Sequence, residues 1–156
     1  MYRIAIPTKG RSHLIAKQTI GFLVKNKIDI SKVDIFVGSK EEADDYKKVL
    51  SEIYKNPYII HEQKDLMSIV NYIHDYYKNK TDVKWLLRLD DDIINIIDKN
   101  NRGIQGLDKF IKKMFKITED NSLSLWGINA YDNPFFFKDT ISTNLKYIVG
   151  CLNGWV

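Results

Sequence analysis

The chain has 156 residues, and 44% of them are hydrophobic, which is enough for one domain with a single core and argues against disorder. Lys and Arg outnumber Asp and Glu by 24 to 20, a mild excess that is compatible with anionic ligands but excludes a strongly basic nucleic-acid-binding tail. A single cysteine, Cys151, excludes an intramolecular disulfide and a cysteine-based zinc site. We therefore expect a reducing, cytoplasmic setting without a signal peptide or a membrane span.

Strands and helices alternate through the first hundred residues. Short apolar or β-rich runs predict strands at 3–6, 33–37, 58–60 and 84–89. Helical periodicity predicts helices at 14–25, 41–54 and 66–77, the last with Asp65 as its cap. The segment 66–77 has the clearest helical spacing of apolar residues.

The last third is less regular. A helix is predicted at 107–114, followed by strands at 124–127 and 147–150. The pattern weakens from Ser122 onward and the sequence stops soon after an apolar segment, so we expect a truncated or minimal version of a longer fold.

The alternation predicts an α/β domain over residues 1–156 with a mostly parallel sheet and helices on both faces. Ligands of such sheets bind beyond the carboxyl ends of the strands. The segments 7–12 and 90–92 follow the first and fourth predicted strands, and we expect them to form the ligand crevice.

Three consecutive carboxylates, Asp90, Asp91 and Asp92, follow the fourth predicted strand. They repel one another, and burying them unpaired would cost several kcal/mol each. A hard divalent cation, Mn²⁺ or Mg²⁺, would neutralise them and would also attract phosphate oxygens. If strand geometry continues, Asp90 and Asp92 share one side and bind the metal, while Asp91 serves a ribose or sugar hydroxyl. The alternative is a solvated acidic turn.

Together, the Ile-Pro-Thr at 6–8, Arg11 in the following loop and the Asp-x-Asp at 90–92 resemble the GT-A glycosyltransferases, particularly those of family 2. The resemblance implies a Rossmann-like nucleotide-diphospho-sugar transferase fold, with 1–100 binding the nucleotide sugar and 101–156 facing the acceptor. It further implies that Pro7, Thr8 and Arg11 border the nucleotide base and diphosphate. The expected activity is metal-dependent transfer from a nucleoside-diphosphate sugar, with UDP-sugars favoured.

Other positions have two interpretations each. Arg88 either assists the diphosphate or is a surface residue, and Asp65 either contacts the donor or only caps its helix. Many family members place an acid after the second strand, where this chain offers Ser39 or Glu41 instead. Asp132 is the best candidate for a general base, and its alternative role is turn formation.

A weaker resemblance connects the Ile-Pro-Thr-Lys-Gly-Arg opening and the stretch 127–137 with viral and phage glycosyltransferases associated with modified DNA bases. It implies a virus-infected host cell as one cytoplasmic setting. The acceptor stays open among a glycan, a small molecule and a modified DNA base.

Two other functions compete with the glycosyltransferase. A nucleotidyltransferase on a related sheet would need a glycine-rich loop after the first strand, and residues 8–12 are a poor version of one. A non-catalytic nucleotide-sugar-binding module would keep the fold and lose turnover, as the scarcity of acids after Asp120 allows.

Overall fold

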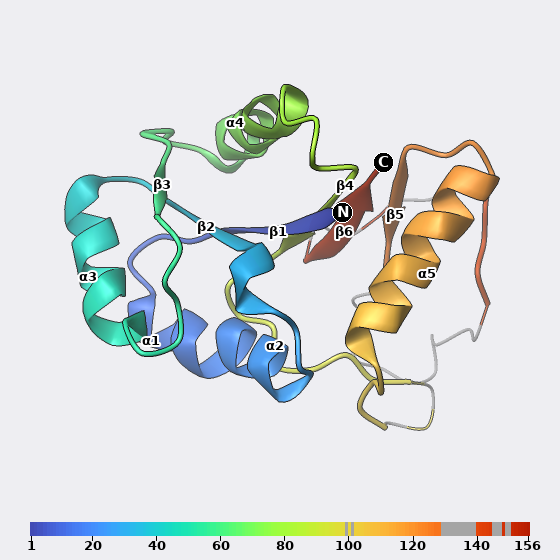
Figure 1. The fold of residues 1–156 in the computed structure, drawn as a ribbon, viewed down its shortest axis with the longest axis horizontal. Coiled ribbons are helices and arrows are strands. Elements are labelled where there is room, and N and C mark those ends of the chain that lie inside the picture. The colour runs from blue at the N-terminus through green and yellow to red at the C-terminus, as the bar shows by residue number, and fades with distance from the viewer. Residues whose placement is uncertain (99, 101, 129–139, 145–147, 149–150) are drawn as a thin grey trace.

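The computed structural model describes residues 1–98, 100, 102–128, 140–144, 148 and 151–156, and Figure 1 shows their arrangement. Six strands form one sheet in the order β3-β2-β1-β4-β6-β5. The strands are β1 (Tyr2–Pro7), β2 (Val33–Val37), β3 (Ile59–Ile60), β4 (Trp85–Leu89), β5 (Leu125–Gly127) and β6 (Leu152–Trp155). The four strands predicted in the first hundred residues and the one at 124–127 are thus confirmed to within two residues at either end.

Helices connect these strands. They are α1 (Ser12–Ile15), η1 (Ala16–Ile20), α2 (Gly21–Lys25), η2 (Ile30–Lys32), α3 (Lys40–Leu50), α4 (Leu66–Lys78) and α5 (Leu107–Asp120). The predicted helix at 14–25 is one continuous helical run, but its middle part, η1, is a π-helical turn. The predicted helix at 107–114 extends to Asp120.

The sheet is mixed, which corrects the prediction of a mostly parallel sheet. β1 pairs in parallel with β2 and β4, and β2 pairs in parallel with β3. β6, however, runs antiparallel between β4 and β5. The chain reaches β5 through α5 and then returns, so its last strand inserts in the opposite direction.

The main core lies between one face of the sheet and the helices α1, η1, α2, α3 and α5. Ile4, Ile6 and Ile35 point to this face and are fully buried. Phe115 of α5 is also fully buried and stacks on Trp85 with ring centroids 5.0 Å apart. This core therefore joins both predicted halves of the chain.

α4 covers the opposite face. Ala5 and Phe36 point to that side and pack with Ile73 and Tyr77 in a second apolar cluster. After β3 the chain turns back across β2 and β1 to reach β4, and a right-handed crossover in that direction places the connecting helix on the other face. Helices on both faces are thus confirmed, and α4 lies on the opposite side of the sheet from α1–α3 in Figure 1.

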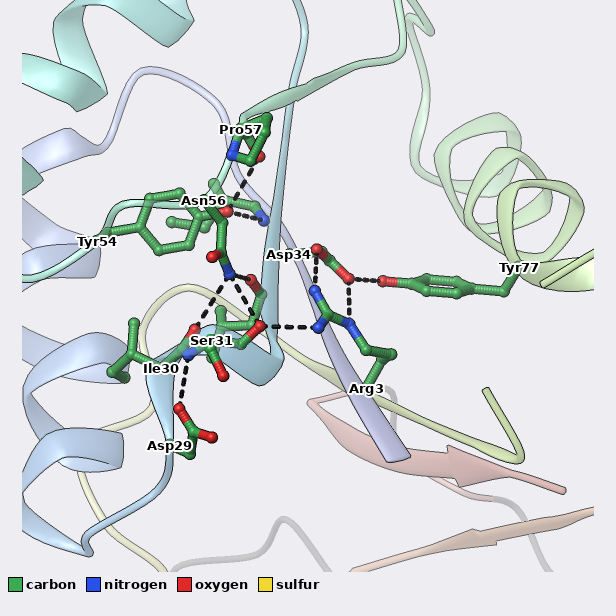
Figure 2. Close-up of polar contacts among 11 residues, drawn as sticks. Arg3, Asp29, Ile30, Ser31, Asp34, Tyr54, Asn56, Pro57 and Tyr77 are labelled. Atoms are coloured by element: carbon green, nitrogen blue, oxygen red, sulfur yellow. Dashed lines mark hydrogen bonds and ion pairs between the residues drawn. The ribbon is translucent and has the colours of Figure 1, made fainter. Parts of the chain in front are cut away.

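A buried polar network holds the amino ends of β1 and β2 together (Figure 2). The Arg3 guanidinium makes a two-pronged ion pair with the Asp34 carboxylate, and the Tyr77 hydroxyl of α4 donates to the same carboxylate. Arg3 also donates to the Ser31 carbonyl at 2.7 Å. Each charge in this network has an opposite partner, and we call it the amino-end cluster.

The predicted strand at 147–150 falls on residues of which only Ile148 is described, and Ile148 lies outside any strand. The last strand, β6, begins later, at Leu152. Among the described residues, none of the helices combines the length and the apolar character that crossing a membrane requires.

Candidate functional site

The acidic residues lie where the direction of strand order reverses. From β1, the chain proceeds to β2 and β3 on one side and later to β4 on the other, so the switch point lies between β1 and β4. The residues that follow these two strands are Thr8 to Arg11 and Asp90 to Asp92. In open α/β sheets the crevice at this point binds ligands. The predicted crevice segments are therefore neighbours.

Asp91 is the buried member of the acidic trio, with 6% of its surface exposed. Its Oδ2 accepts a hydrogen bond from the Thr8 hydroxyl at 2.5 Å, and its Oδ1 pairs with Arg11 Nη1 at 3.0 Å. These contacts join the loop after β1 to the end of β4. Asp91 thus has a fixed orientation.

Asp92 points to the same arginine from a more exposed position. Its Oδ2 lies 3.6 Å from Arg11 Nη1, and its side chain is 52% exposed. Asp91 and Asp92 therefore converge on one positively charged nitrogen. The expected alternation, in which Asp90 and Asp92 share a side, does not describe this turn, because β4 ends at Leu89 and Asp91 and Asp92 lie in a turn beyond it.

Asp90 pairs with a different arginine. Its Oδ1 lies 3.4 Å from Arg88 Nη2, and Arg88 is almost fully buried on β4. Burial raises the pKa of Asp90, the Arg88 charge opposes that rise, and the Asp92 and Asp91 charges add to it. Among the described residues, these three carboxylates thus face two guanidinium groups.

The loop after β1 is held by α3. The Arg11 N–H donates to the Tyr46 hydroxyl at 2.8 Å, and the Tyr46 oxygen lies 2.7 Å from Thr8 Oγ1. Because the Thr8 proton goes to the Asp91 carboxylate, Tyr46 must donate to Thr8. Burial raises the pKa of Tyr46, so it keeps this proton. The chain of hydrogen bonds from Arg11 N–H to Asp91 is therefore oriented throughout.

Glu42 ties the loops after β1 and β2 together. Its carboxylate accepts from the Gly10 N–H at 2.9 Å and from the Gly38 N–H at 2.8 Å. Gly10 has a φ of +64°, a conformation that favours glycine. Glu41, which the sequence offered as the acid after the second strand, is exposed, and its neighbour Glu42 is the residue that contacts the strand ends.

The turn after β4 is held from two sides. The Thr19 hydroxyl of η1 donates to the Asp90 carbonyl and accepts from the Ile93 N–H, both at 2.8 Å. The Asp90 N–H donates to the Cys151 carbonyl at 2.9 Å. We call Asp90–Ile93 the acidic turn.

The remaining predicted residues have structural roles or lie elsewhere. Ser39 caps α3 by accepting from the Glu42 N–H at 3.2 Å, and Asp65 caps α4 by accepting from the Ser68 N–H at 3.0 Å. Asp65 therefore caps its helix, as the sequence predicts. Pro7 ends β1 beside the crevice. Asp132, the predicted base, lies outside the described residues.

Sequence reasoning missed Thr19, Glu42 and Tyr46. Thr19 had a recognisable signal, because it is a polar residue on the apolar face of a predicted helix, beside Ile15 and Ile20. Tyr46 and Glu42 are ordinary helix residues in sequence, and the distance of 38 positions between Thr8 and Tyr46 hides their contact.

The carboxylates of the acidic turn can be compared with the ways in which proteins bind divalent cations. In the described part of the chain, no three His, Cys, Asp or Glu side chains gather in a way that could hold a metal ion. Asp91 and Asp92 instead form a pair that faces one cationic group. Mg²⁺ is commonly bound by one or two carboxylates, with water and substrate phosphate oxygens completing its coordination. The two carboxylates fit that mode.

Comparison with known proteins adds no assignment: no model of a known protein family matches the chain, and a search of curated proteins finds no significant match.

Proposed function

We propose that the chain is a metal-dependent glycosyltransferase that moves a sugar from a nucleoside-diphosphate sugar, with UDP-sugars favoured, to an acceptor. The observation that carries the proposal is the convergence of Asp91 and Asp92 on one cationic nitrogen at the switch point of the sheet. The motif resemblance at 6–8, Arg11 and 90–92 supports a nucleotide sugar as the ligand and the GT-A type as the fold.

The donor diphosphate fits the charges at this edge. Mn²⁺ or Mg²⁺ held by Asp92 and Asp91, with Asp90 close by, would stabilise the negative charge that develops on the leaving diphosphate. Asp92 is half exposed and therefore reachable from solvent, whereas Asp91 is held in place by Thr8. The carboxylates thus combine access with a fixed orientation.

Arg11 has a second role in this proposal. Its side chain is 53% exposed and occupies the position between the two carboxylates. Once a cation neutralises these carboxylates, the guanidinium is available to bind the diphosphate. Its backbone stays anchored to Tyr46, so the side chain alone has to turn. Arg88 stays with Asp90 on β4.

A cytoplasmic setting is part of the proposal, and a free thiol at the site supports it. Cys151 is a free cysteine whose carbonyl supports the acidic turn. We place the reaction in the cytoplasm, where thiols stay reduced.

Ligand-dependent thermal stability tests the binding part of the proposal. A ligand at about 100 times its dissociation constant adds about 2.7 kcal/mol to the unfolding free energy. We expect Mn²⁺ with UDP or a UDP-sugar to give such a shift, and Mn²⁺ with GDP-sugars or nucleoside triphosphates to give less. Asp92→Asn should abolish it, whereas Asp45→Asn, which removes an exposed carboxylate paired with Lys48, should keep it. Equal shifts without metal would contradict the proposal.

Release of free UDP from a UDP-sugar tests the catalytic part. We expect Mn²⁺-dependent release by the wild type and by Asp45→Asn, and its loss in Asp92→Asn. A stability shift without any UDP release would favour a non-catalytic nucleotide-sugar-binding module. A shift selective for nucleoside triphosphates would favour a nucleotidyltransferase.

A further inference from the structure

The acidic turn has to hold three like charges in a defined arrangement. Repulsion among Asp90, Asp91 and Asp92 favours conformations that spread the carboxylates apart. The turn lies beyond the end of β4, so the sheet ladder stops before Asp91. Another group must therefore fix the backbone of the turn.

Thr19 makes contacts that close this turn. Its single hydroxyl donates to the Asp90 carbonyl and accepts from the Ile93 N–H, so it joins the first and last residues of the turn. Thr19 is fully buried, and both hydrogen bonds are partly buried. Asp91 and Asp92 lie between these two points.

Thr19 uses its hydroxyl differently from Thr118, the other threonine in the described helices. A threonine inside a helix commonly donates to the carbonyl four residues earlier. Thr118 of α5 does so, with its hydroxyl 2.8 Å from the Met114 carbonyl, and it is 2% exposed. Thr19 instead directs its hydroxyl away from its own helix. The two threonines are equally buried and differ in what their hydroxyls contact.

The π-helical turn η1 surrounds Thr19. π-turns are rare and frequently occur at functional sites. Gly21 follows η1 directly, and a Cβ at that position would lie 3.3 Å from the Ala16 carbonyl oxygen, a tight contact. A glycine at this point therefore gives the wider turn room beside the carbonyl.

We propose that Thr19 is a positioning residue for the cation site: its hydroxyl fixes the acidic turn in the arrangement in which Asp91 and Asp92 face one cation. The consequence for ligand binding rests on the proposed function. The positioning itself concerns the ligand-free protein.

Two measurements on three variants test this proposal. Thr19→Val keeps the shape of the side chain and removes the hydroxyl, Thr19→Ser keeps the hydroxyl, and Thr118→Val is the matched control. The first measurement is the hydrogen-exchange rate of the Ile93 amide without ligand, relative to the Ile111 amide in α5. The second is the dissociation constant for Mn²⁺ in the presence of UDP, followed by electron paramagnetic resonance of free Mn²⁺.

We expect Thr19→Val to accelerate Ile93 exchange and to raise the Mn²⁺ dissociation constant about 10- to 100-fold, the range typical of residues that orient metal ligands. Thr19→Ser and Thr118→Val should resemble the wild type in both. A Thr19→Val protein with wild-type exchange at Ile93 and wild-type Mn²⁺ affinity would overturn the proposal.

The exchange measurement separates this proposal from the proposed function. If the wild type takes up no Mn²⁺ with UDP, the glycosyltransferase assignment fails, and Ile93 exchange alone then decides the role of Thr19. Faster exchange in Thr19→Val than in Thr19→Ser supports positioning, and equal exchange refutes it. Should Thr19→Val fail to fold, Thr19→Ala compared with Thr118→Ala gives the same two readouts.

Discussion

Two arginine–aspartate clusters lie at opposite ends of the sheet and differ in how their charges are paired. In the amino-end cluster, Arg3 and Asp34 pair one to one, and the Tyr77 hydroxyl donates a hydrogen bond to the same carboxylate (Figure 2). At the carboxyl end, Arg11 and Arg88 face three carboxylates, and Asp92 is half exposed. A closed cluster with one-to-one pairing stabilises a fold, whereas an open cluster, in which the described carboxylates outnumber the guanidinium groups they face, leaves room for a positive ligand.

Removing the carboxylate of the amino-end cluster should have the largest effect on stability. Asp34→Ala leaves the Arg3 guanidinium and the Tyr77 hydroxyl without their common partner. Breaking a buried pair in this way commonly costs 3–5 kcal/mol, and because the Arg3 side chain keeps 20% exposure we expect about 3 kcal/mol. Urea unfolding measures the loss. A loss below about 1 kcal/mol would place this cluster with ordinary surface pairs.

Tyr77→Phe removes one contact and keeps the ion pair. Tyr77 is buried, and its hydroxyl donates to a charged oxygen of Asp34. Hydrogen bonds to charged groups contribute about 1.5–3 kcal/mol, and we expect a loss near the lower end because Arg3 still pairs with the carboxylate. Burial and the Asp34 charge raise the pKa of Tyr77, so the wild-type hydroxyl stays protonated in any ordinary buffer. The same urea experiment, run beside Asp34→Ala, gives the ranking.

Truncating an arginine at each end should separate the clusters by their response to Mn²⁺. Arg11→Ala should cost about 1 kcal/mol, because the half-exposed guanidinium contributes less than a buried one and Asp91 keeps its bond to Thr8. We expect Mn²⁺ alone to restore this loss by occupying the place of the guanidinium. Arg3→Ala is the control and should show no recovery with Mn²⁺. Recovery of both variants, or of neither, would contradict the difference between the clusters.

Lowering the pH should reduce the unfolding free energy through His61, and we expect this effect to be smaller than those of the substitutions above. His61 follows β3, and burial lowers its pKa below the ordinary 6.5. Its Nδ1 accepts from the Gln63 N–H, a bond that protonation would break. The unfolded chain takes up this proton at a higher pH than the folded chain. The contribution of His61 to stability is therefore complete above pH 6.5 and falls as the pH drops towards the folded pKa.

The experiment measures the unfolding free energy from pH 7 to pH 5. His61→Asn should reduce its dependence on pH, and His74 should account for some of the remaining dependence, because burial also lowers the pKa of His74. An unchanged slope in His61→Asn would be evidence against this contribution.

Much of the fold was predictable from local sequence. The apolar spacing at 66–77 and the buried run at 84–89 correspond to α4 and β4, and the alternation of elements placed the segments 7–12 and 90–92 at one edge. Strand β6 was missed because Leu152–Trp155 includes Asn153 and Gly154, which are poor strand formers, and its pairing with β4 and β5 is long-range. An antiparallel insertion is decided by such pairing.

The sequence predicted where the candidate site lies, but not which side chains contact one another there. Strand alternation paired Asp90 with Asp92, and this rule fails where the strand ends at Leu89 and a turn begins. Only the fold shows that Asp91 and Asp92 meet Arg11, and that Thr19 closes the turn from a helix 71 residues away from Asp90 in sequence. Arg3 and Asp34 were each visible as a charge within an apolar strand, but their parallel register was needed to bring them together.

The substitution Asp92→Asn tests the central claim, that the open cluster at the carboxyl end leaves room for a bound cation. Without ligand, removing this half-exposed charge relieves repulsion, and we expect the unfolding free energy to stay within about 0.5 kcal/mol of the wild type or to rise. With Mn²⁺ present and UDP at about 100 times its dissociation constant for the wild type, the wild type should gain about 2.7 kcal/mol and Asp92→Asn should gain none. A destabilised Asp92→Asn protein, together with a wild type that gains nothing from Mn²⁺ and UDP, would show that the acidic turn serves only the fold.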